Sequence, residues 1–327
     1  MRQVNPGPPP LYALDFSAWK RPVVRRCFAG NTLVFLNDAD KVPAGATVVI
    51  WGMRPFSGSL APDAEIIRLE DGFLRSVGLG ADLIRPMSWV VDHRGMYYDS
   101  TRPSDLECIL GQTDFSPGLL GRAAALRERI VAQGLTKYNV GARQWQRPSG
   151  DKQVLLVPGQ VESDASLAYG APGLRTNLDL LRAVRQENPH AFIVYKPHPD
   201  VIAGLRAKGI NEDQARQWCD QVVVDVPMDT LLSQVDGVQV LTSLAGFEAL
   251  LRHTPVTCYG QPFYGGWGLT RDIIAHPRRQ RRLTLDQLVA GALLLYPLYL
   301  SRTSDALISA EQALDELIQW RSQTGPQ

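Results

Sequence analysis

The segments VYKPHPD (residues 194–200) and LTSLAGFEALL (residues 241–251) carry the strongest signals for the fold of this 327-residue chain. Each continues an apolar run that predicts a β-strand, and each turns polar where that run ends. His198 stands between two prolines, which fix the backbone so that the imidazole projects from the strand end. Because ligands of parallel α/β sheets bind beyond the carboxyl ends of the strands, both segments are expected at one site.

The second half of the chain alternates apolar runs with helical stretches, which is typical of βα units around a mostly parallel sheet. The runs are apolar throughout, as expected for strands that are covered by helices on both faces. Strands are predicted over residues 153–159, 191–197, 221–227, 237–243 and 255–260, and helices over 173–188, 201–208, 228–235 and 244–252.

The first half shows a separate series of the same kind, with strands predicted over 32–36, 47–52, 65–70 and 88–92 and a helix over 117–134. The segment 141–152 combines Gly, Pro, Ser and charged residues, as linkers do. The predicted fold class is α/β, with two Rossmann-like, doubly wound domains facing a cleft, which is the glycosyltransferase B arrangement. The expected units are an acceptor-side domain (1–145), a donor-binding domain (146–305) and a C-terminal helix (306–327) that could return to the first domain.

Composition excludes several classes of protein. The chain is 45% hydrophobic and 20% charged with a net charge of +1, which describes a soluble globular chain too long for one typical domain. Its four cysteines lack the spacing of a disulfide framework or a zinc site. The chain starts without an apolar signal segment, and its longest apolar stretch, 288–300, is interrupted by Pro297. A cytoplasmic protein is therefore expected.

Two groups of basic residues interrupt this balanced charge. Such groups meet phosphates or anionic lipid headgroups, and they also occur as ordinary solvated loops. They allow a peripheral contact with a membrane, whereas nucleic acid is not an expected partner because no nucleic-acid-reading motif accompanies them. The groups are Lys20, Arg21, Arg25 and Arg26, and Arg278, Arg279, Arg281 and Arg282.

The polar residues after two of the strands suit a sugar-nucleotide phosphate. A protonated His198, with Lys196 beside it, would stabilise a leaving phosphate. Thr242 or Ser243 caps the next helix, whose free N–H groups attract phosphate or carboxylate, and Glu248 could accept hydrogen bonds from ribose hydroxyls. A capped loop histidine and an ordinary hydroxyl cap are the structural alternatives. The combination favours a glycosyltransferase.

The segment GQVESD (159–164) follows the first strand of the second half and brings carboxylates to the cleft. Asp164 could attack an anomeric carbon or deprotonate an acceptor. Glu162 is a second carboxylate there, and Gln160 is a candidate substrate-binding residue. The alternative is a simple turn, since polar residues after a strand often form one.

The first half contributes LEDGFLR (69–75) to the same cleft. Glu70 or Asp71 could act as the acceptor-side base, and Arg75 could pair with an anionic sugar. A structural Arg–carboxylate pair in a turn explains the same residues. Further candidates for sugar binding, which core tyrosines explain almost as well, are Tyr98, Lys137 and Tyr138.

Taken together, several motifs resemble the bacterial capsule polysaccharide β-Kdo transferases of the KpsC type over roughly residues 19–300; they include WGMRP, RLEDGFLRSVGLG, GMYYD, TKYNVG, LVPGQVESDAS, VYKPHPDV, LTSLAGFEALL and CYGQPFYGGWGLT. Such proteins carry two transferase modules, and this chain is more similar to the C-terminal one. The resemblance implies a retaining enzyme of the glycosyltransferase B fold that needs no metal or other cofactor. Its donor would be CMP-β-Kdo, which carries a keto-sugar acid, and its acceptor a Kdo-terminated, lipid-linked glycolipid of the capsule linker.

The resemblance also implies a double displacement, because an enzyme nucleophile is the economical route to retention. Asp164 would form a Kdo-enzyme ester, and Glu70 is the first candidate for the base of the second step, with Asp71 or Glu162 left open. Carried over to this sequence, the donor-site residues are His198 and Lys196 for the CMP phosphate, Thr242 and Ser243 for the phosphate or sugar carboxylate, and Glu248 for the ribose.

Other functions fit part of this pattern. A non-catalytic carbohydrate- or glycolipid-binding module could retain the fold, and a CMP-sialic acid transferase or a UDP-sugar enzyme could use a similar cleft. The resemblance further implies possible contact with the inner membrane and, in a longer protein, a second transferase module as partner.

Overall fold

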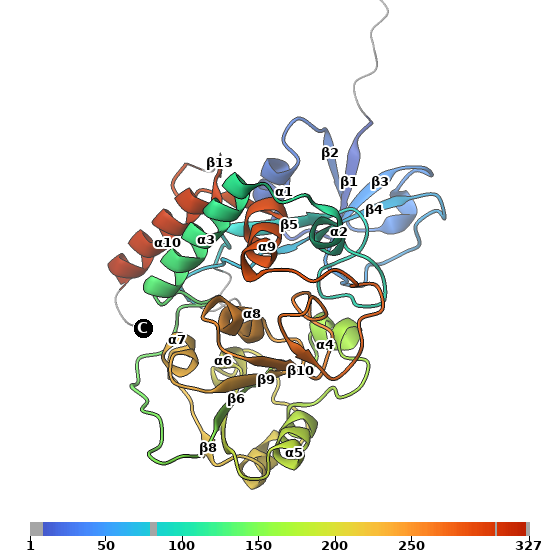
Figure 1. The fold of residues 1–327 in the computed structure, drawn as a ribbon. Helices are drawn as coiled ribbons and strands as arrows, with labels where there is room; N and C mark the ends of the chain where they lie inside the picture. Colours follow the sequence, from blue (N-terminus) through green and yellow to red (C-terminus); the bar gives the residue numbers. More distant parts are fainter. Residues whose placement is uncertain (1–8, 79–83, 305, 325–327) are drawn as a thin grey trace, which may run out of the picture.

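The computed structural model describes residues 9–78, 84–304 and 306–324, and its strands form two sheets with helices around them (Figure 1). Residues 79–80 of the RLEDGFLRSVGLG motif and the outer ends of the expected units lie outside these ranges. Within them, the first sheet has the strand order β13-β12-β5-β4-β3-β1-β2, and the second has the order β11-β10-β9-β6-β7-β8. The chain therefore has an α/β fold with one mixed and one parallel sheet.

The first sheet comprises β1 Leu11–Leu14, β2 Leu33–Leu36, β3 Thr47–Trp51, β4 Glu65–Asp71, β5 Ser88–Asp92, β12 Pro297–Leu300 and β13 Leu307–Ile308. The second comprises β6 Val154–Pro158, β7 Phe192–Lys196, β8 Gln221–Val222, β9 Gly237–Val240, β10 Val256–Cys258 and β11 Arg271–Asp272. The helices are α1 Arg21–Cys27, α2 Asp105–Gln112, α3 Pro117–Ala132, α4 Ala165–Gly170, α5 Asn177–Glu187, α6 Pro199–Ile202, α7 Met228–Leu232, α8 Leu244–Leu251, α9 Leu285–Val289 and α10 Ala310–Thr324, with short turns of 3₁₀ helix at Ala39–Lys41 (η1) and Glu212–Gln217 (η3) and a π-helix at Ala290–Leu295 (η4).

The second sheet follows the sequence pattern closely, and its strands pair in parallel. Every residue of β6 and β9 is buried, which explains why these strands are apolar apart from Gln239. Pro158 lies opposite Lys196 in the register of β6 and β7, so these two strands end at the same edge. The loops that follow them therefore meet, as ligand sites of parallel sheets require.

The first sheet departs from the doubly wound expectation. Strands β2, β1, β3 and β4 are parallel, but β5 runs antiparallel to β4, and β12 runs antiparallel to β5. The chain reverses after β4, where the amide of Gly72 donates a hydrogen bond to the Ser88 carbonyl. Strand β1, which pairs with both β2 and β3, was not predicted because its four residues, LYAL, follow a proline-rich segment.

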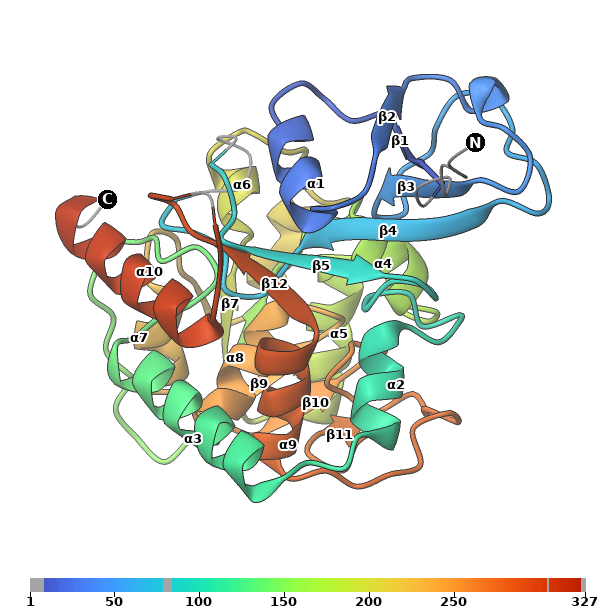
Figure 2. The same cartoon turned by 90° about the horizontal axis from the view of Figure 1, so that it is seen from above.

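The end of the chain crosses back to the first half earlier than expected. The apolar stretch 288–300 forms the end of α9, the π-helix η4 and β12, and β12 pairs with β5 of the first sheet. Residues 297–300, which the predicted division assigns to the donor-binding unit, are thus part of the first sheet, because β5 offers an open edge on which this apolar segment is buried. Helix α10 packs near α3, where Arg122 and Arg129 pair with Glu311 and Asp315 (Figure 2).

Two predicted elements of the second half are much shorter in the structure. The strand expected over 221–227 covers only Gln221–Val222, since Asp225 adopts a left-handed backbone with φ of 57°. The helix expected over 201–208 is replaced by the one-turn helix α6, because the amides of Leu205 and Arg206 bond back to the Asp200 carbonyl. Both changes end a strand or helix close to the candidate site.

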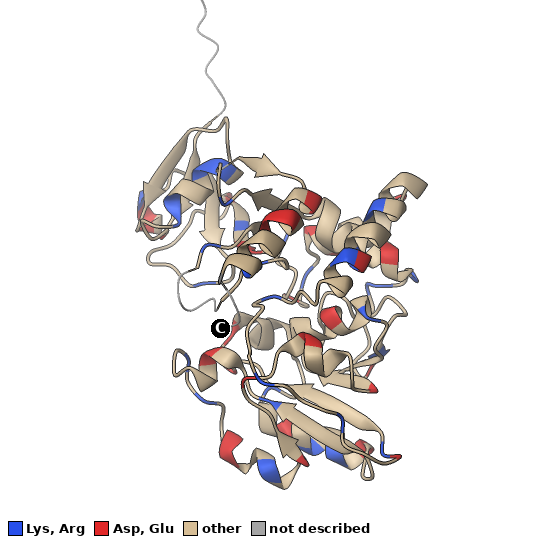
Figure 3. Cartoon of the chain, turned by 90° about the vertical axis from the view of Figure 1, so that its left-hand side faces the viewer, with Lys and Arg blue, Asp and Glu red and all other residues tan. Residues whose placement is uncertain are grey.

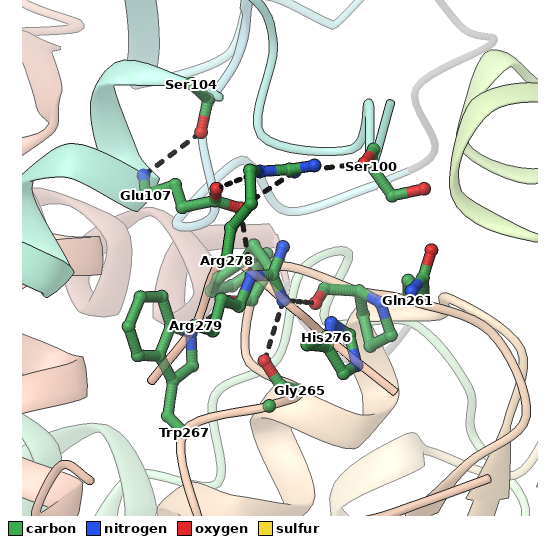
Figure 4. A network of polar contacts seen from close by, with 12 residues as sticks. Ser100, Ser104, Glu107, Gln261, Gly265, Trp267, His276, Arg278 and Arg279 are labelled. Carbon is green, nitrogen blue, oxygen red and sulfur yellow. Dashed lines mark hydrogen bonds and ion pairs between the residues drawn. The ribbon is translucent and has the colours of Figure 1, made fainter. Parts of the chain in front are cut away.

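Two arginines of the late basic group, Arg278 and Arg279, connect the two halves of the chain (Figure 4). Arg279 is only 8% exposed and donates to the carbonyls of Pro262 and Gly265 at 2.5 and 2.7 Å and to Glu107 of α2 at 3.0 Å. Arg278 also pairs with Glu107, at 2.6 Å. Both arginines are therefore engaged within the protein, although the Arg278 side chain is still 36% exposed. Elsewhere, basic and acidic residues are interspersed over both halves (Figure 3).

We predict that Glu107→Gln destabilises the fold by about 3 kcal/mol, because it leaves a buried arginine without its carboxylate partner. The measurement is thermal and denaturant unfolding. The matched control is Glu128→Gln on α3, whose side chain is 71% exposed and whose loss should change the free energy of unfolding by less than about 0.5 kcal/mol. Equal stability of the two variants would contradict this reading of the arginine network.

Candidate functional site

A cavity of about 530 Å³ lies where the loops after β6, β7 and β9 face the ends of β3 and β4. Residues from both halves line it, together with the segment 136–140. Of the residues predicted for the site, those that line the cavity are Glu70, Asp71, Arg75, Tyr98, Lys137, Tyr138, Gln160, Asp164, Lys196, His198, Thr242, Ser243 and Glu248.

Glu162 is the predicted site residue that does not line the cavity. Its carboxylate accepts hydrogen bonds from the backbone amides of Asn177 and Ile210, both at 2.8 Å. These bonds tie the start of α5 and the 209–212 segment to the loop after β6. The structure therefore gives Glu162 a loop-fixing role and removes it as a candidate base.

Gln160 and Thr242 hold two strand ends together. The Gln160 side chain accepts from the Thr242 amide at 2.9 Å and donates to the Thr242 hydroxyl at 3.0 Å. That hydroxyl in turn lies 3.4 Å from the Ser166 carbonyl. Because the amide and hydroxyl of Thr242 are both engaged within the protein, Thr242 shapes the site, and Ser243 is the better placed of the two for direct contact with a ligand.

Ser243 is the N-cap of α8, where its hydroxyl oxygen accepts a hydrogen bond from the Ala245 amide at 3.3 Å. This bond leaves the hydroxyl proton available to a ligand. The Tyr264 hydroxyl donates to the Ser243 carbonyl and fixes the entry to the helix. The start of α8 thus presents a hydroxyl and a positive helix end to the cavity.

His198 differs from the sequence-based expectation in its charge. Burial, together with the positive charges of Lys137, Arg206 and Lys196, lowers the pKa of His198 to about 4. The ring is therefore neutral at pH 7, and its Nδ1 accepts from the Asp200 amide at 3.2 Å. In that tautomer Nε2 carries the proton and can donate to a phosphate oxygen, so His198 can act as a neutral donor.

Lys196 and Glu248 are buried groups whose ionisation also responds to the cavity. Burial lowers the pKa of Lys196 to about 8, and its ammonium donates to the Val226 carbonyl at 2.7 Å. Burial raises the pKa of Glu248 to about 7, although its carboxylate accepts from the Lys137 amide at 2.6 Å. These two residues face the cavity from the end of β7 and from α8.

Asp164 has the opposite environment. It is the N-cap residue of α4, and its side chain is 41% exposed. The guanidinium of Arg206 donates a hydrogen bond to Asp164 Oδ1 at 2.6 Å. The other carboxylate oxygen, Oδ2, takes no part in this bond. Arg206 also lines the cavity. The sequence predicts a helix over residues 201–208 and carries no local signal that places Arg206 in the site.

Glu70 and Asp71 divide their roles at the end of β4. Asp71 pairs with the buried Arg75 at 2.7 Å, so Arg75 is committed within the protein instead of being free for an anionic sugar. Glu70 lies 3.4 Å from the Tyr98 hydroxyl. Burial and the charge of Asp71 raise the pKa of Glu70 to about 7. Glu70 is therefore the better candidate for a base that works near neutral pH.

Gly52 permits the close approach of Glu70 and Tyr98 to the end of β3. Its φ is 47°, and a Cβ atom there would lie 2.5 Å from Glu70 Oε2 and 2.6 Å from the Tyr98 hydroxyl. The neighbouring Met53 amide donates to the same hydroxyl at 3.1 Å. A glycine is thus required at this position by both conformation and space.

Sequence reasoning also missed three residues at the first-half rim of the cavity, Trp19, Lys20 and Trp51. Lys20 belongs to the early basic group, but its side chain lies over the Trp51 ring inside the cavity. The signals available in the sequence were the Trp19–Lys20 pair and, separately, Trp51 near the end of the predicted strand 47–52.

In the described residues, no group of three or more His, Cys, Asp or Glu side chains is arranged to hold a metal ion, and metal independence stays a prediction. No helix within the same ranges has the length and apolar character needed to cross a membrane.

Comparison with known proteins identifies the family. A family model described as capsule polysaccharide biosynthesis protein matches residues 47–124 and 119–302. The solved structure of Thermosulfurimonas dismutans KpsC, beta Kdo 2,7 transferase, is 41% identical, with a TM-score of 0.79 over 95% of this chain and 99% of that one. That of Thermosulfurimonas dismutans KpsC, beta Kdo 2,4 transferase, is 33% identical, with a TM-score of 0.80 over 94% and 98%.

Two curated relatives agree with this result. The capsule polysaccharide modification protein LipA of Neisseria meningitidis serogroup A is 43% identical over an alignment of 324 residues, which covers 95% of this chain and 46% of LipA. The lipopolysaccharide-processing protein LpsZ of Rhizobium meliloti is 38% identical over 316 residues, 91% of this chain and 72% of LpsZ. The chain thus spans about half the length of LipA. These matches confirm the resemblance seen in the motifs, and the chain belongs to the capsule polysaccharide biosynthesis family, among the KpsC-type Kdo transferases.

Proposed function

We propose that this chain is a retaining glycosyltransferase that moves Kdo from CMP-β-Kdo to a Kdo-terminated, lipid-linked acceptor of the capsule linker. The observation that carries the proposal is the pairing, across one cavity, of Asp164 from the second half with Glu70 from the first. One carboxylate is ion-paired and partly exposed, and the other is buried with a pKa near 7. The two sheets facing this cavity are consistent with a glycosyltransferase B arrangement.

The second half is suited to the donor. His198 Nε2–H and the hydroxyl of Ser243 at the start of α8 can donate to the phosphate of CMP. Binding of that anion would favour the charged form of Lys196, whose pKa is about 8 in the free protein. Glu248 can accept hydrogen bonds from the ribose hydroxyls. These groups supply the phosphate stabilisation for which many transferases use a metal.

The first displacement uses Asp164. Its Oδ2 attacks the anomeric carbon of Kdo, the bond from that carbon to the phosphate oxygen breaks, and CMP leaves with the bonding electrons. Arg206, which donates a hydrogen bond to Oδ1, orients the carboxylate for this attack. The product is an ester between Kdo and Asp164 with inverted configuration at the anomeric carbon.

The second displacement uses Glu70. Its carboxylate takes the proton from the acceptor hydroxyl as that oxygen attacks the anomeric carbon, and the ester bond to Asp164 breaks. Two inversions give net retention. No metal is required by these steps.

The chain is 41% identical in sequence to the KpsC 2,7 transferase and 33% identical to the KpsC 2,4 transferase. We therefore propose that it makes a 2,7 linkage.

Because LipA is about twice as long as the match, a full-length protein with a second transferase module is also proposed. Contact with the inner membrane stays a prediction.

We predict that Asp164→Asn still binds CMP but loses Kdo transfer by at least about a thousandfold, since the amide cannot form the ester. Wild-type protein incubated with CMP-Kdo alone should gain the mass of one Kdo residue, and the variant should not. Asp213→Asn, at a side chain that is 76% exposed, is the matched control and should behave like the wild type. Full transfer activity in Asp164→Asn would remove the proposed nucleophile.

We predict that the acceptor-dependent rate rises about tenfold per pH unit up to about pH 7 and then levels, because Glu70 acts only when ionised and its pKa is about 7. Glu70→Gln should remove this pH dependence and let the Kdo-protein ester accumulate. Single-turnover kinetics with mass spectrometry of the protein provide the measurement. An unchanged pH profile in the variant would assign the base to another group.

A further inference from the structure

Lys20 differs from the other cations that line the cavity. Arg75 pairs with Asp71 at 2.7 Å, Arg206 pairs with Asp164 at 2.6 Å, and Lys196 donates to a backbone carbonyl. The fifth, Lys137, is hydrogen-bonded to Tyr138. Within the described residues, by contrast, the Lys20 ammonium makes neither an ion pair nor a hydrogen bond, and its contacts are with aromatic rings.

The rings that hold Lys20 are the indoles of Trp51 and Trp19. Lys20 Nζ lies over the Trp51 ring and 5.4 Å from the centroid of Trp19. Trp51 is fixed in turn by edge-on contacts with Phe16 and Trp89, at centroid distances of 6.5 and 5.9 Å. A cation held by aromatic faces keeps its hydrogen-bond donors for a ligand, because ring faces accept no conventional hydrogen bond.

The position of Lys20 assigns it to the acceptor side. It lies just before α1, on the half that contributes Glu70, and the charges of Glu70 and Asp71 act on it. The donor phosphate is expected at the opposite wall, near His198 and Ser243. An acceptor hydroxyl placed at Glu70 for deprotonation would bring the rest of its sugar ring close to Lys20.

We propose that Lys20, held by Trp19 and Trp51, binds the carboxylate of the acceptor's terminal sugar acid. This inference rests on the proposed function and adds the group that selects an acidic acceptor. The two indoles would hold the ammonium in place, and the ammonium would donate charge-assisted hydrogen bonds to the carboxylate.

The ionisation of Lys20 agrees with this assignment. Burial lowers the pKa of Lys20 to about 8, against the opposing charges of Glu70 and Asp71, while the positive charges of Arg54 and Arg75 lower it further. A carboxylate beside the ammonium favours the charged form. Acceptor binding should therefore weaken as the pH rises above about 8, where the free protein begins to lose this charge.

The experiment compares two acceptors that differ only at the terminal sugar acid, one with a free carboxylate and one with a carboxamide. Wild-type protein should show a KM about 10- to 100-fold lower for the carboxylate. Lys20→Met, which keeps an apolar stem over Trp51, should raise KM for the carboxylate acceptor to the carboxamide value and leave KM for CMP-Kdo within about twofold. Lys20→Arg should recover part of the discrimination.

The control variant is Lys41→Met, at an exposed lysine of the same half outside the cavity, and it should keep the wild-type preference. Isothermal titration of each variant with the carboxylate acceptor alone gives a readout that does not depend on turnover, and circular dichroism verifies folding. If Lys20→Met keeps the wild-type preference, or if only KM for CMP-Kdo rises, the proposal is overturned. If the wild type neither forms the Kdo-protein ester nor modifies either acceptor, the proposed function fails, and this inference fails with it.

Discussion

The pairing of β12 with β5 determines how the two halves of the chain meet. Pro297 lies opposite Val90, so a segment that follows the whole second sheet becomes part of the first. Helix α9 then packs against α3, and the buried Arg279 joins the loop after β10 to Glu107 on α2. The halves are thus connected at several places besides the segment 141–152. The cavity lies between walls whose relative position these connections fix.

Burial is the common cause of the unusual ionisation in this cavity. It raises the pKa of Glu70 and Glu248 to about 7 and lowers that of His198 to about 4 and of Lys196 to about 8. Several groups therefore carry less charge in the free protein than they would in water. An anionic ligand reverses part of this effect, because it favours the charged forms of lysine and histidine. Donor binding and proton uptake are consequently coupled.

Local patterns could be predicted from the sequence, and long-range pairings could not. The motifs around His198, Ser243 and Asp164 follow short apolar strands of a parallel sheet, and the rule that strand ends form the site placed them in one cavity. The antiparallel β5 and the return of β12 depend on which sheet edge is open, a property that no local pattern encodes. The same holds for Arg206 and Lys20, whose partners lie 42 and 31 positions away in the sequence.

Asp164 and Glu70 show how the environment can give one chemical group two roles. Asp164 is partly exposed and is oriented by its ion pair with Arg206, which suits a nucleophile that must reach an anomeric carbon. Glu70 forms no ion pair with an arginine among the described residues, and burial beside Asp71 raises its pKa to about 7, against the charges of Lys20 and Lys137. A nucleophile benefits from a low affinity for protons, whereas a base must accept one and release it again. The proposed assignment of roles therefore follows from solvation and neighbouring charge, and exchanging the two residues' surroundings would exchange their chemistry.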